Sequence, residues 1–138
     1  MNRQNYNLGG RMETDTKEVG KIEQEEKKET ERINYDYFSK IELRTATVLQ
    51  AEKVENTTKL MKLNIDLGYE QRQIVAGIAE SYSPEELIGK QIIIVANLEP
   101  RKIKGNVSNG MLLAVENPDG KIILLTTEKK AENGLQVR

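Results

Sequence analysis

Three cations stand close together in the sequence and are well suited to binding an anionic partner. Arg101, Lys102 and Lys104 lie between the apolar runs QIIIVA and LLAV, beside Pro100 and Gly105. A guanidinium can hold a phosphate through two hydrogen bonds, and lysine ammonium groups act as mobile point charges. The formal net charge is only −1, so any affinity for nucleic acid must be local. The cluster predicts a binding loop, although surface lysines are often merely solvated.

The residue types that the sequence lacks exclude most catalytic chemistry. There is neither histidine nor cysteine. The chain therefore has no Ser-His or Cys-His nucleophile, no imidazole base, and no imidazole or thiolate ligands for zinc. A paired-carboxylate mechanism is formally open, but no two acidic residues obviously converge. We expect a protein that is not an enzyme and has no cofactor and no metal site.

The hydropathy of the chain bears on where it works. No apolar stretch approaches the roughly 18–20 residues that are needed to cross a bilayer, and no signal-peptide core follows Met1. The absence of cysteine fits a reducing compartment. The sequence therefore predicts a cytoplasmic protein without a membrane partner.

Composition changes near residue 33 and divides the chain in two. Residues 1–32 contain seven Lys/Arg, eight Asp/Glu and only a few separated apolar residues. Such a stretch is typical of a charged, flexible linker or tether. From Ile33 onward the charges balance, fourteen against fourteen, and apolar periodicity begins. We therefore predict a tether over residues 1–32 and a folded domain over residues 33–138.

The folded part reads as strands with two short helices. Asn34 can cap a first helix, and SPEELIG predicts a second, with Ser83 as N-cap and Glu86 closing a capping box. The alternation in LMKLNIDL is typical of a half-buried strand, and QIIIVAN of a strand buried on both faces. Further strands are expected in LRTATVLQAEKV, EQRQIVAG, GMLLAVE and KIILLTT, the last two joined by an NPDG turn.

This order of elements predicts an all-β fold. Three strands, one short helix and further strands are typical of a five-stranded OB-fold barrel, in which the helix lies between strands 3 and 4. An N-terminal helix and extra C-terminal strands would then be additions to the barrel. A half-open sandwich satisfies the same spacing.

Two segments carry a resemblance to a known family. They are YFSKIELRTATVLQAEKVENTTKLMKLNIDLG and IVAGIAESYSPEELIGKQIIIVANLEPRKIKGNVSNGMLLA, and they resemble the C-terminal tRNA-binding domain of methionyl-tRNA synthetases and free-standing relatives. The likeness covers about Ile33 to Arg138. It implies an OB-fold that binds structured tRNA, commonly as a homodimer built with the N-terminal helical segment and C-terminal strands. It also implies a helper for a synthetase catalytic body that lies elsewhere, in the same or a separate chain, because the catalytic motifs are absent here.

The resemblance also implies which residues face RNA. The matching positions are Lys59, Arg101, Lys102, Lys104, Ser108 and Met111. The Ser108 hydroxyl would meet a phosphate or a 2′-OH, whereas Met111 either lies against a ribose or base or belongs to the core. Asn97 can read a base edge or merely brace its loop.

Aromatic residues are too few for a base-stacking platform. The chain has no Trp, one Phe and five Tyr, of which only Tyr69, at a predicted turn, could serve easily. OB-folds that hold single strands usually stack bases on aromatic side chains. We therefore expect recognition of RNA shape and backbone. Two other functions fit the same barrel: an export-chaperone relative that binds unfolded peptides, and a protein-assembly module in which the basic loop is incidental.

Overall fold

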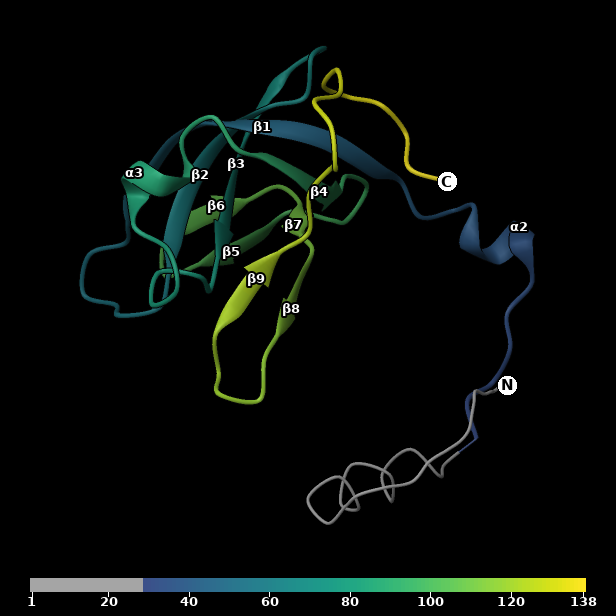
Figure 1. The fold of residues 1–138 in the computed structure, drawn as a ribbon, viewed down its shortest axis with the longest axis horizontal. Coiled ribbons are helices and arrows are strands. Elements are labelled where there is room, and N and C mark those ends of the chain that lie inside the picture. The colour runs from purple at the N-terminus through teal and green to yellow at the C-terminus, as the bar shows by residue number, and fades with distance from the viewer. Residues whose placement is uncertain (1–28) are drawn as a thin grey trace. The chain divides into compact units, whose positions relative to one another are not determined.

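The computed structural model describes residues 29–138, and Tyr35–Arg138 form one compact unit. The predicted tether, residues 1–32, lies almost wholly outside the described residues, so the domain boundary stays a prediction. Figure 1 shows strands joined by short connections, with little helix. The elements are α2 (Tyr35–Phe38), β1 (Leu43–Lys53), β2 (Met61–Asp66), β3 (Gln71–Ala76), α3 (Pro84–Leu87), β4 (Gln91–Val95), β5 (Arg101–Ile103), β6 (Asn106–Ser108), β7 (Met111–Leu112), β8 (Ala114–Glu116) and β9 (Ile122–Leu124).

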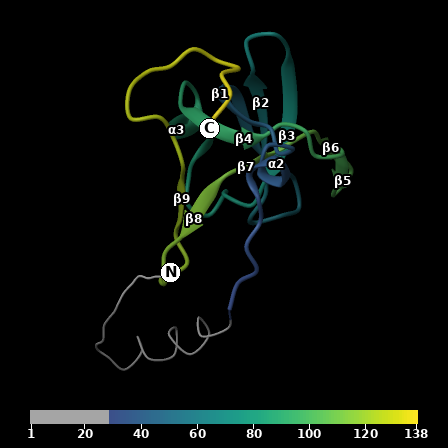
Figure 2. The ribbon, with the colours of Figure 1, turned by 90° about the vertical axis from the view of Figure 1, so that its right-hand side faces the viewer.

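A five-stranded antiparallel sheet in the order β3-β2-β1-β4-β7 forms the body of the fold. The eleven-residue β1 pairs with β4 along its first half and with β2 along its second half, and Thr47 pairs with both. The β1–β2 register shifts between Val48 and Gln50, and such a bulge increases the twist of a strand. The sheet curls, and β6 lies beside β3, on the edge of β3 that does not pair with β2 (Figure 2). The predicted OB-like barrel is confirmed.

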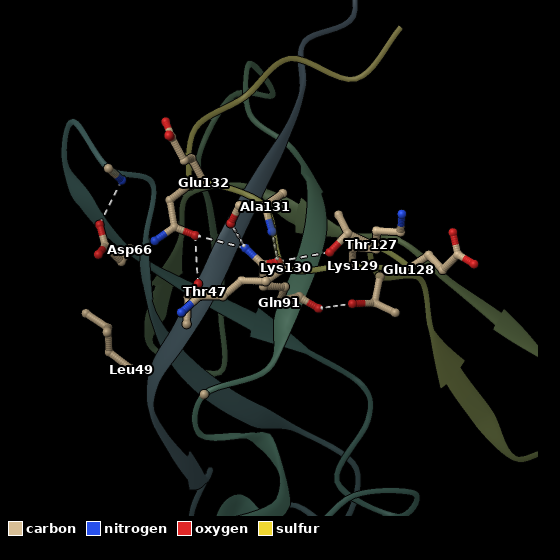
Figure 3. A pocket seen from close by; sticks show the side chains of 14 residues that line it. Thr47, Leu49, Asp66, Gln91, Thr127, Glu128, Lys129, Lys130, Ala131 and Glu132 are labelled. Atoms are coloured by element: carbon tan, nitrogen blue, oxygen red, sulfur yellow. Dashed lines mark hydrogen bonds between the residues drawn. The ribbon is translucent and has the colours of Figure 1, made fainter.

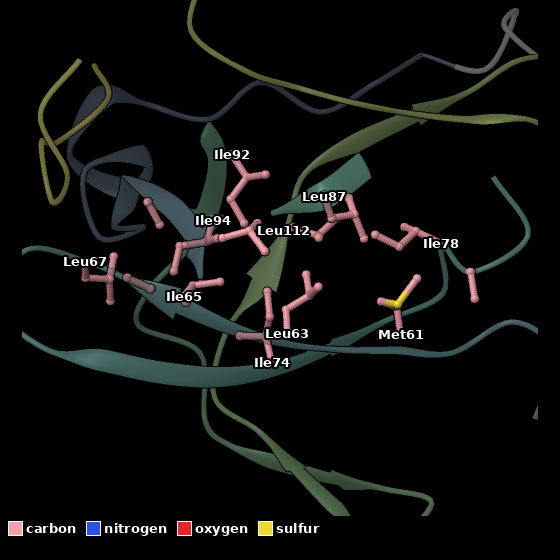
Figure 4. Packing of buried hydrophobic residues seen from close by; sticks show 14 residues of the cluster. Met61, Leu63, Ile65, Leu67, Ile74, Ile78, Leu87, Ile92, Ile94 and Leu112 are labelled. Carbon is pink, nitrogen blue, oxygen red and sulfur yellow. The ribbon is translucent and has the colours of Figure 1, made fainter. Parts of the chain in front are cut away.

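The core lies inside this curled sheet (Figure 4). On β2 the side chains of Met61, Leu63 and Ile65 are buried, while the residues between them are half-exposed, as the alternation in the sequence predicts. The run Ile92–Val95 of β4 is buried throughout, which confirms a strand covered on both faces. Burial of these large aliphatic side chains supplies the main stabilisation of the fold.

The short helix α3 lies between β3 and β4, as predicted. Ser83 Oγ accepts a hydrogen bond from Glu86 N at 3.3 Å, and Glu86 Oε2 accepts one from Ser83 N at 3.3 Å. This capping box satisfies backbone donors that a four-residue helix cannot satisfy itself. Leu87 is fully buried in the core.

The predicted strand GMLLAVE is in fact two strands. Leu113 N donates to Ile93 O at 2.9 Å, whereas Leu113 O accepts from Leu125 N at 3.0 Å. The chain therefore leaves the main sheet at this residue and enters the separate β8–β9 hairpin. The turn of that hairpin contains Gly120 with φ of 92°, as the NPDG motif predicts.

A C-terminal arm, residues 131–137, lies along the first half of β1, and the sequence does not predict it. Thr45 N donates to Leu135 O at 3.0 Å, Gly134 N to Thr45 O at 2.7 Å, and Val137 N to Leu43 O at 2.8 Å. β2 ends at Asp66, which pairs with Thr47. The β2-facing edge of β1 before Thr47 therefore has no strand of the main sheet beside it. The arm covers backbone groups that would otherwise be an open edge.

Candidate nucleic-acid interface

The basic segment forms a β-hairpin rather than the predicted loop. β5 pairs with β6 so that Arg101 lies opposite Ser108 and Lys102 opposite Val107. Lys104 and Gly105 connect the strands with φ of 50° and 83°, which is typical of a type I′ turn. Each strand has three residues, too short for an alternation signal, and lysine is unusual in a left-handed turn. These two features hide the hairpin in the sequence.

The hairpin exposes its cations. Arg101, Lys102 and Lys104 are all exposed, and within residues 29–138 none of their side chains forms an ion pair or a hydrogen bond. Ile103 is half-buried, and Ser108, which shares its face of the hairpin, is buried. The three charges thus lie on a hairpin, and no carboxylate of the described residues forms an ion pair with them.

Ser108 fastens the hairpin to the barrel. Its side chain is buried, at 5% exposure, and Oγ accepts a hydrogen bond from Val75 N at 2.9 Å while donating to Gly110 O at 3.2 Å. Asn109 N donates to Gln73 O at 2.9 Å beside it. The hydroxyl satisfies a buried amide that would otherwise cost about 1–3 kcal/mol. In this structure Ser108 therefore positions the hairpin, and its hydroxyl does not face solvent.

Asn97 has a bracing role in the structure. Its Oδ1 accepts from Glu42 N at 2.9 Å, and its Nδ2 donates to Lys40 O at 2.7 Å. The amide thereby ties the chain that precedes β1 to the chain that follows β4. Met111, by contrast, lies on β7, where it pairs with Val95 of β4. It keeps 49% of its surface exposed, so it is available for contact rather than part of the core.

Lys59 lies in a second connection, between β1 and β2. Its side chain is exposed, and its carbonyl oxygen accepts a hydrogen bond from Ala79 N at 2.9 Å. The same connection approaches the hairpin tip: a recess of about 510 Å³ is lined by residues 52–56 together with Lys62, Lys104 and Asn106. The structure therefore brings the hairpin and the start of the β1–β2 connection together, with Lys59 a few residues beyond.

A wider recess of about 1000 Å³ lies beside the C-terminal arm (Figure 3). Several of its polar side chains bind one another and the backbone of the arm. Gln91 Oε1 accepts from Thr127 Oγ1 at 2.9 Å and from Ala131 N at 2.8 Å, and Thr47 Oγ1 donates to Asn133 Oδ1 at 2.7 Å. These contacts secure the arm.

Other kinds of site find no support in the described residues. Within residues 29–138 no group of three or more Asp, Glu, His or Cys side chains could hold a metal ion. In the same residues no helix is long and apolar enough to cross a membrane. The lining of the hairpin recess contains no aromatic residue.

Several known proteins resemble this chain. The family model described as a putative tRNA binding domain matches residues 43–136. Methionine–tRNA ligases from Caldanaerobacter subterraneus subsp. tengcongensis and Archaeoglobus fulgidus are 51% and 52% identical over 129 and 115 residues, covering 88% and 83% of this chain. The matched regions are 20% and 17% of those ligases, so the chain spans about a fifth of their length.

Two solved structures share the fold. The MetRS related protein from Pyrococcus horikoshii is 42% identical, with a TM-score of 0.75, and the match covers 79% of this chain and 100% of that protein. The chaperone CsaA from Bacillus anthracis is 31% identical, with a TM-score of 0.71, and the match covers 78% of this chain and 100% of the chaperone.

Proposed function

Since this chain belongs to the family of putative tRNA-binding domains, we propose that it binds structured tRNA through the β5–β6 hairpin. In this proposal it is a non-catalytic part of the methionyl-tRNA synthetase system and works in the cytoplasm. The observation that carries the proposal is that Arg101, Lys102 and Lys104 are exposed on one hairpin without side-chain partners in the described chain.

The site residues divide into two roles. Arg101, Lys102, Lys104 and Lys59 are exposed and would contact phosphates, which supply most of the affinity of proteins for nucleic acids. Met111 would lie against a ribose or base. The predicted contacts of Ser108 and Asn97 become indirect: both side chains already hold backbone groups, so they would set the position of the cations.

Binding of this kind would follow the contour of the RNA. Phosphate contacts position a protein on nucleic acid without reading its sequence. The hairpin offers charge but no aromatic platform on which bases could stack. We therefore expect similar affinity for different tRNAs, which suits a general helper of aminoacylation.

The salt dependence of tRNA affinity tests this mechanism. If about three to five phosphates are neutralised, the slope of log K against log salt concentration is expected to be roughly −2 to −4. Filter binding of an unmodified tRNA transcript between 50 and about 300 mM KCl measures it. A flat response contradicts the mechanism. Competition by an unfolded peptide, with unchanged salt response, would instead support the chaperone function suggested by the likeness to CsaA.

A synthetase catalytic body is the proposed partner. The homologous regions are the tRNA-binding parts of ligases about five times as long as the match. The present chain contains no histidine or cysteine for the chemistry of a catalytic centre. The body that aminoacylates tRNA would therefore be joined covalently or bound as a separate chain.

We also propose a homodimer, which an apolar surface supports. On the β8–β9 hairpin Ile122 and Leu124 pack against the core, whereas Val115, Ile123 and Leu125 are 52%, 44% and 38% exposed. Contiguous exposed apolar surface is typical of protein interfaces. A symmetric pair would also place two basic hairpins on one RNA and raise the affinity through effective concentration.

The dimer is checked by its mass. Light scattering at micromolar concentration is expected to return twice the chain mass of 15.7 kDa for the wild type and the monomer mass for Ile123→Glu. A charge at a two-fold interface is desolvated in both subunits, which is costly, while the exposed side chain is tolerated in the monomer. Lys121→Gln, at an exposed site beside the same hairpin, should remain dimeric. A monomeric wild type would remove the dimer and leave the RNA proposal intact.

A further inference from the structure

The recess at the hairpin tip contains an unusual pair of backbone conformations. Asn56 and Lys104 are the two non-glycine residues with positive φ in the described chain, at 63° and 50°. Both line the same recess of about 510 Å³, one from the β1–β2 connection and the other from the β5–β6 turn. Non-glycine residues with a left-handed backbone are uncommon, and such strained residues tend to cluster at functional sites.

The left-handed backbone is less favourable for Lys104 than for Asn56. The first position of a type I′ turn favours Asn, Asp or Gly, and Asn tolerates the left-handed region well. An Asn-Gly turn would connect β5 and β6 with less strain than Lys104-Gly105 does. The lysine therefore does not serve the turn. What it adds is an ammonium group at the rim of the recess.

The other lining residues complete a small polar site. Within the described chain the side chains of Lys53 and Lys104 have no ion pair, whereas Lys62 is held by Glu52 at 2.9 Å. Asn56 makes no side-chain hydrogen bond among these residues, and Asn106 uses only Nδ2, on Lys104 O at 3.1 Å. Glu55 adds an exposed carboxylate. The recess thus offers two cations for a phosphate and two amides with unused hydrogen-bonding groups.

We propose that this recess takes one unstacked nucleotide of the bound RNA. Its phosphate would lie between Lys53 and Lys104, and its base edge would face Asn56 and Asn106. A volume of about 510 Å³ falls within the usual range of about 300–1,000 Å³ for small-ligand sites. Asparagine amides suit base edges, with adenine as the best match. The inference rests on the proposed RNA binding and adds recognition of an unpaired nucleotide to a contact that otherwise follows the backbone.

A bulged RNA duplex tests the inference. We would compare the affinities of a blunt 14-base-pair RNA and the same duplex carrying one bulged adenosine. A third duplex with 2-aminopurine at the bulge, which fluoresces more when it leaves the stack, reports extrusion of the base. The wild type is expected to bind the bulged duplex about tenfold more tightly and to raise the fluorescence several-fold, because an unpaired base costs least to extrude and no aromatic residue lines the recess.

Variants of the recess should remove only the preference for the bulge. Lys53→Gln and Asn56→Gly, which retains the left-handed backbone, should each reduce the tenfold preference to about threefold or less, with affinity for the blunt duplex nearly unchanged. Lys121→Gln has the same charge change as Lys53→Gln at an exposed site outside the recess and should preserve the preference.

A second measurement examines the strain. Lys104→Asn should raise the Tm by about 2–5 °C, because Asn suits the turn, and yet lower the preference for the bulge. Any of three results would overturn the inference. They are a lower Tm for Lys104→Asn, an equal loss of affinity for both duplexes in Lys53→Gln, and equal affinity of the wild type for both duplexes without a fluorescence change. In the last case binding of the blunt duplex would leave the proposed function standing. No binding of either duplex or of tRNA would overturn both.

Discussion

Neutralising the three hairpin cations together is expected to lower tRNA affinity by about 100- to 500-fold near 0.1 M salt. The variant is Arg101→Gln, Lys102→Gln, Lys104→Asn. At a slope of about −0.7 to −0.9 per neutralised phosphate, each cation contributes roughly a factor of 5–8 at this salt concentration, and the three factors multiply. The salt slope should fall in magnitude by about 2–3, since each cation that is removed leaves one phosphate without its partner.

The fold should survive this change. All three side chains are exposed and have no partners in the described chain, and surface changes of this kind usually alter stability by less than about 0.5 kcal/mol. Asn at position 104 also preserves the left-handed turn. Circular dichroism and thermal unfolding check this directly.

A matched control separates a local site from a general charge effect. Lys121→Gln, Lys129→Gln, Lys130→Gln removes the same number of positive charges from exposed sites outside the hairpin. Filter binding should show less than about a threefold loss for this variant, since screening limits the influence of distant charges. Equal losses in both variants would argue against the hairpin as the site. An unchanged affinity in the hairpin variant, with a protein partner retained, would favour the assembly module.

Replacing Gly134 by alanine is expected to lower the free energy of unfolding by about 2–4 kcal/mol, a large loss for a domain of this size. Gly134 has φ of 82°, and a Cβ built there would lie 2.2 Å from Leu67 O. The obstacle is a backbone oxygen, so a side-chain rotation cannot relieve it. The arm would have to leave β1 and give up its hydrogen bonds to Thr45, which is only 4% exposed.

Urea unfolding and the amide exchange of Thr45 measure this effect. Gly77→Ala is the matched control, because no atom beyond its neighbours in the chain lies within 4 Å of a Cβ placed at Gly77 and its φ is not positive. That variant should change stability by less than about 1 kcal/mol. Since the arm binds the first half of β1 and the recess adjoins its last residues, folded Gly134→Ala should retain tRNA affinity. A fully stable Gly134→Ala with a protected Thr45 amide would contradict the role of the arm.

Contacts between near neighbours in the chain were predictable from the sequence. The Ser83–Glu86 capping box spans three residues, the burial of β2 repeats every second residue, and the β8–β9 turn depends on Gly120. In each case the energy is decided by residues within one turn or strand. For the same reason the three hairpin cations, being close neighbours in the chain, could be recognised as one candidate site.

Contacts between distant residues could not be predicted in this way. Ser108 looks like an RNA ligand in the sequence, but its hydroxyl is used by Val75, 33 residues away. Asn97 is used by backbone groups 55 and 57 residues away. The recess joins Asn56 to Lys104, and the only local hint was an Asn and a Lys-Gly pair in turn-forming stretches.

The sequence by itself determined the all-β class, the order of β1 to β4 with the short helix α3 before β4, the absence of imidazole and thiol chemistry, and the place of the cationic segment along the chain. The tertiary structure decided that this segment is a hairpin, which polar side chains hold it and which remain available, and what lies opposite its tip. The physical reason is that propensity and periodicity act over a few residues. The direction and partners of a side chain depend instead on how a curled sheet brings distant strands together.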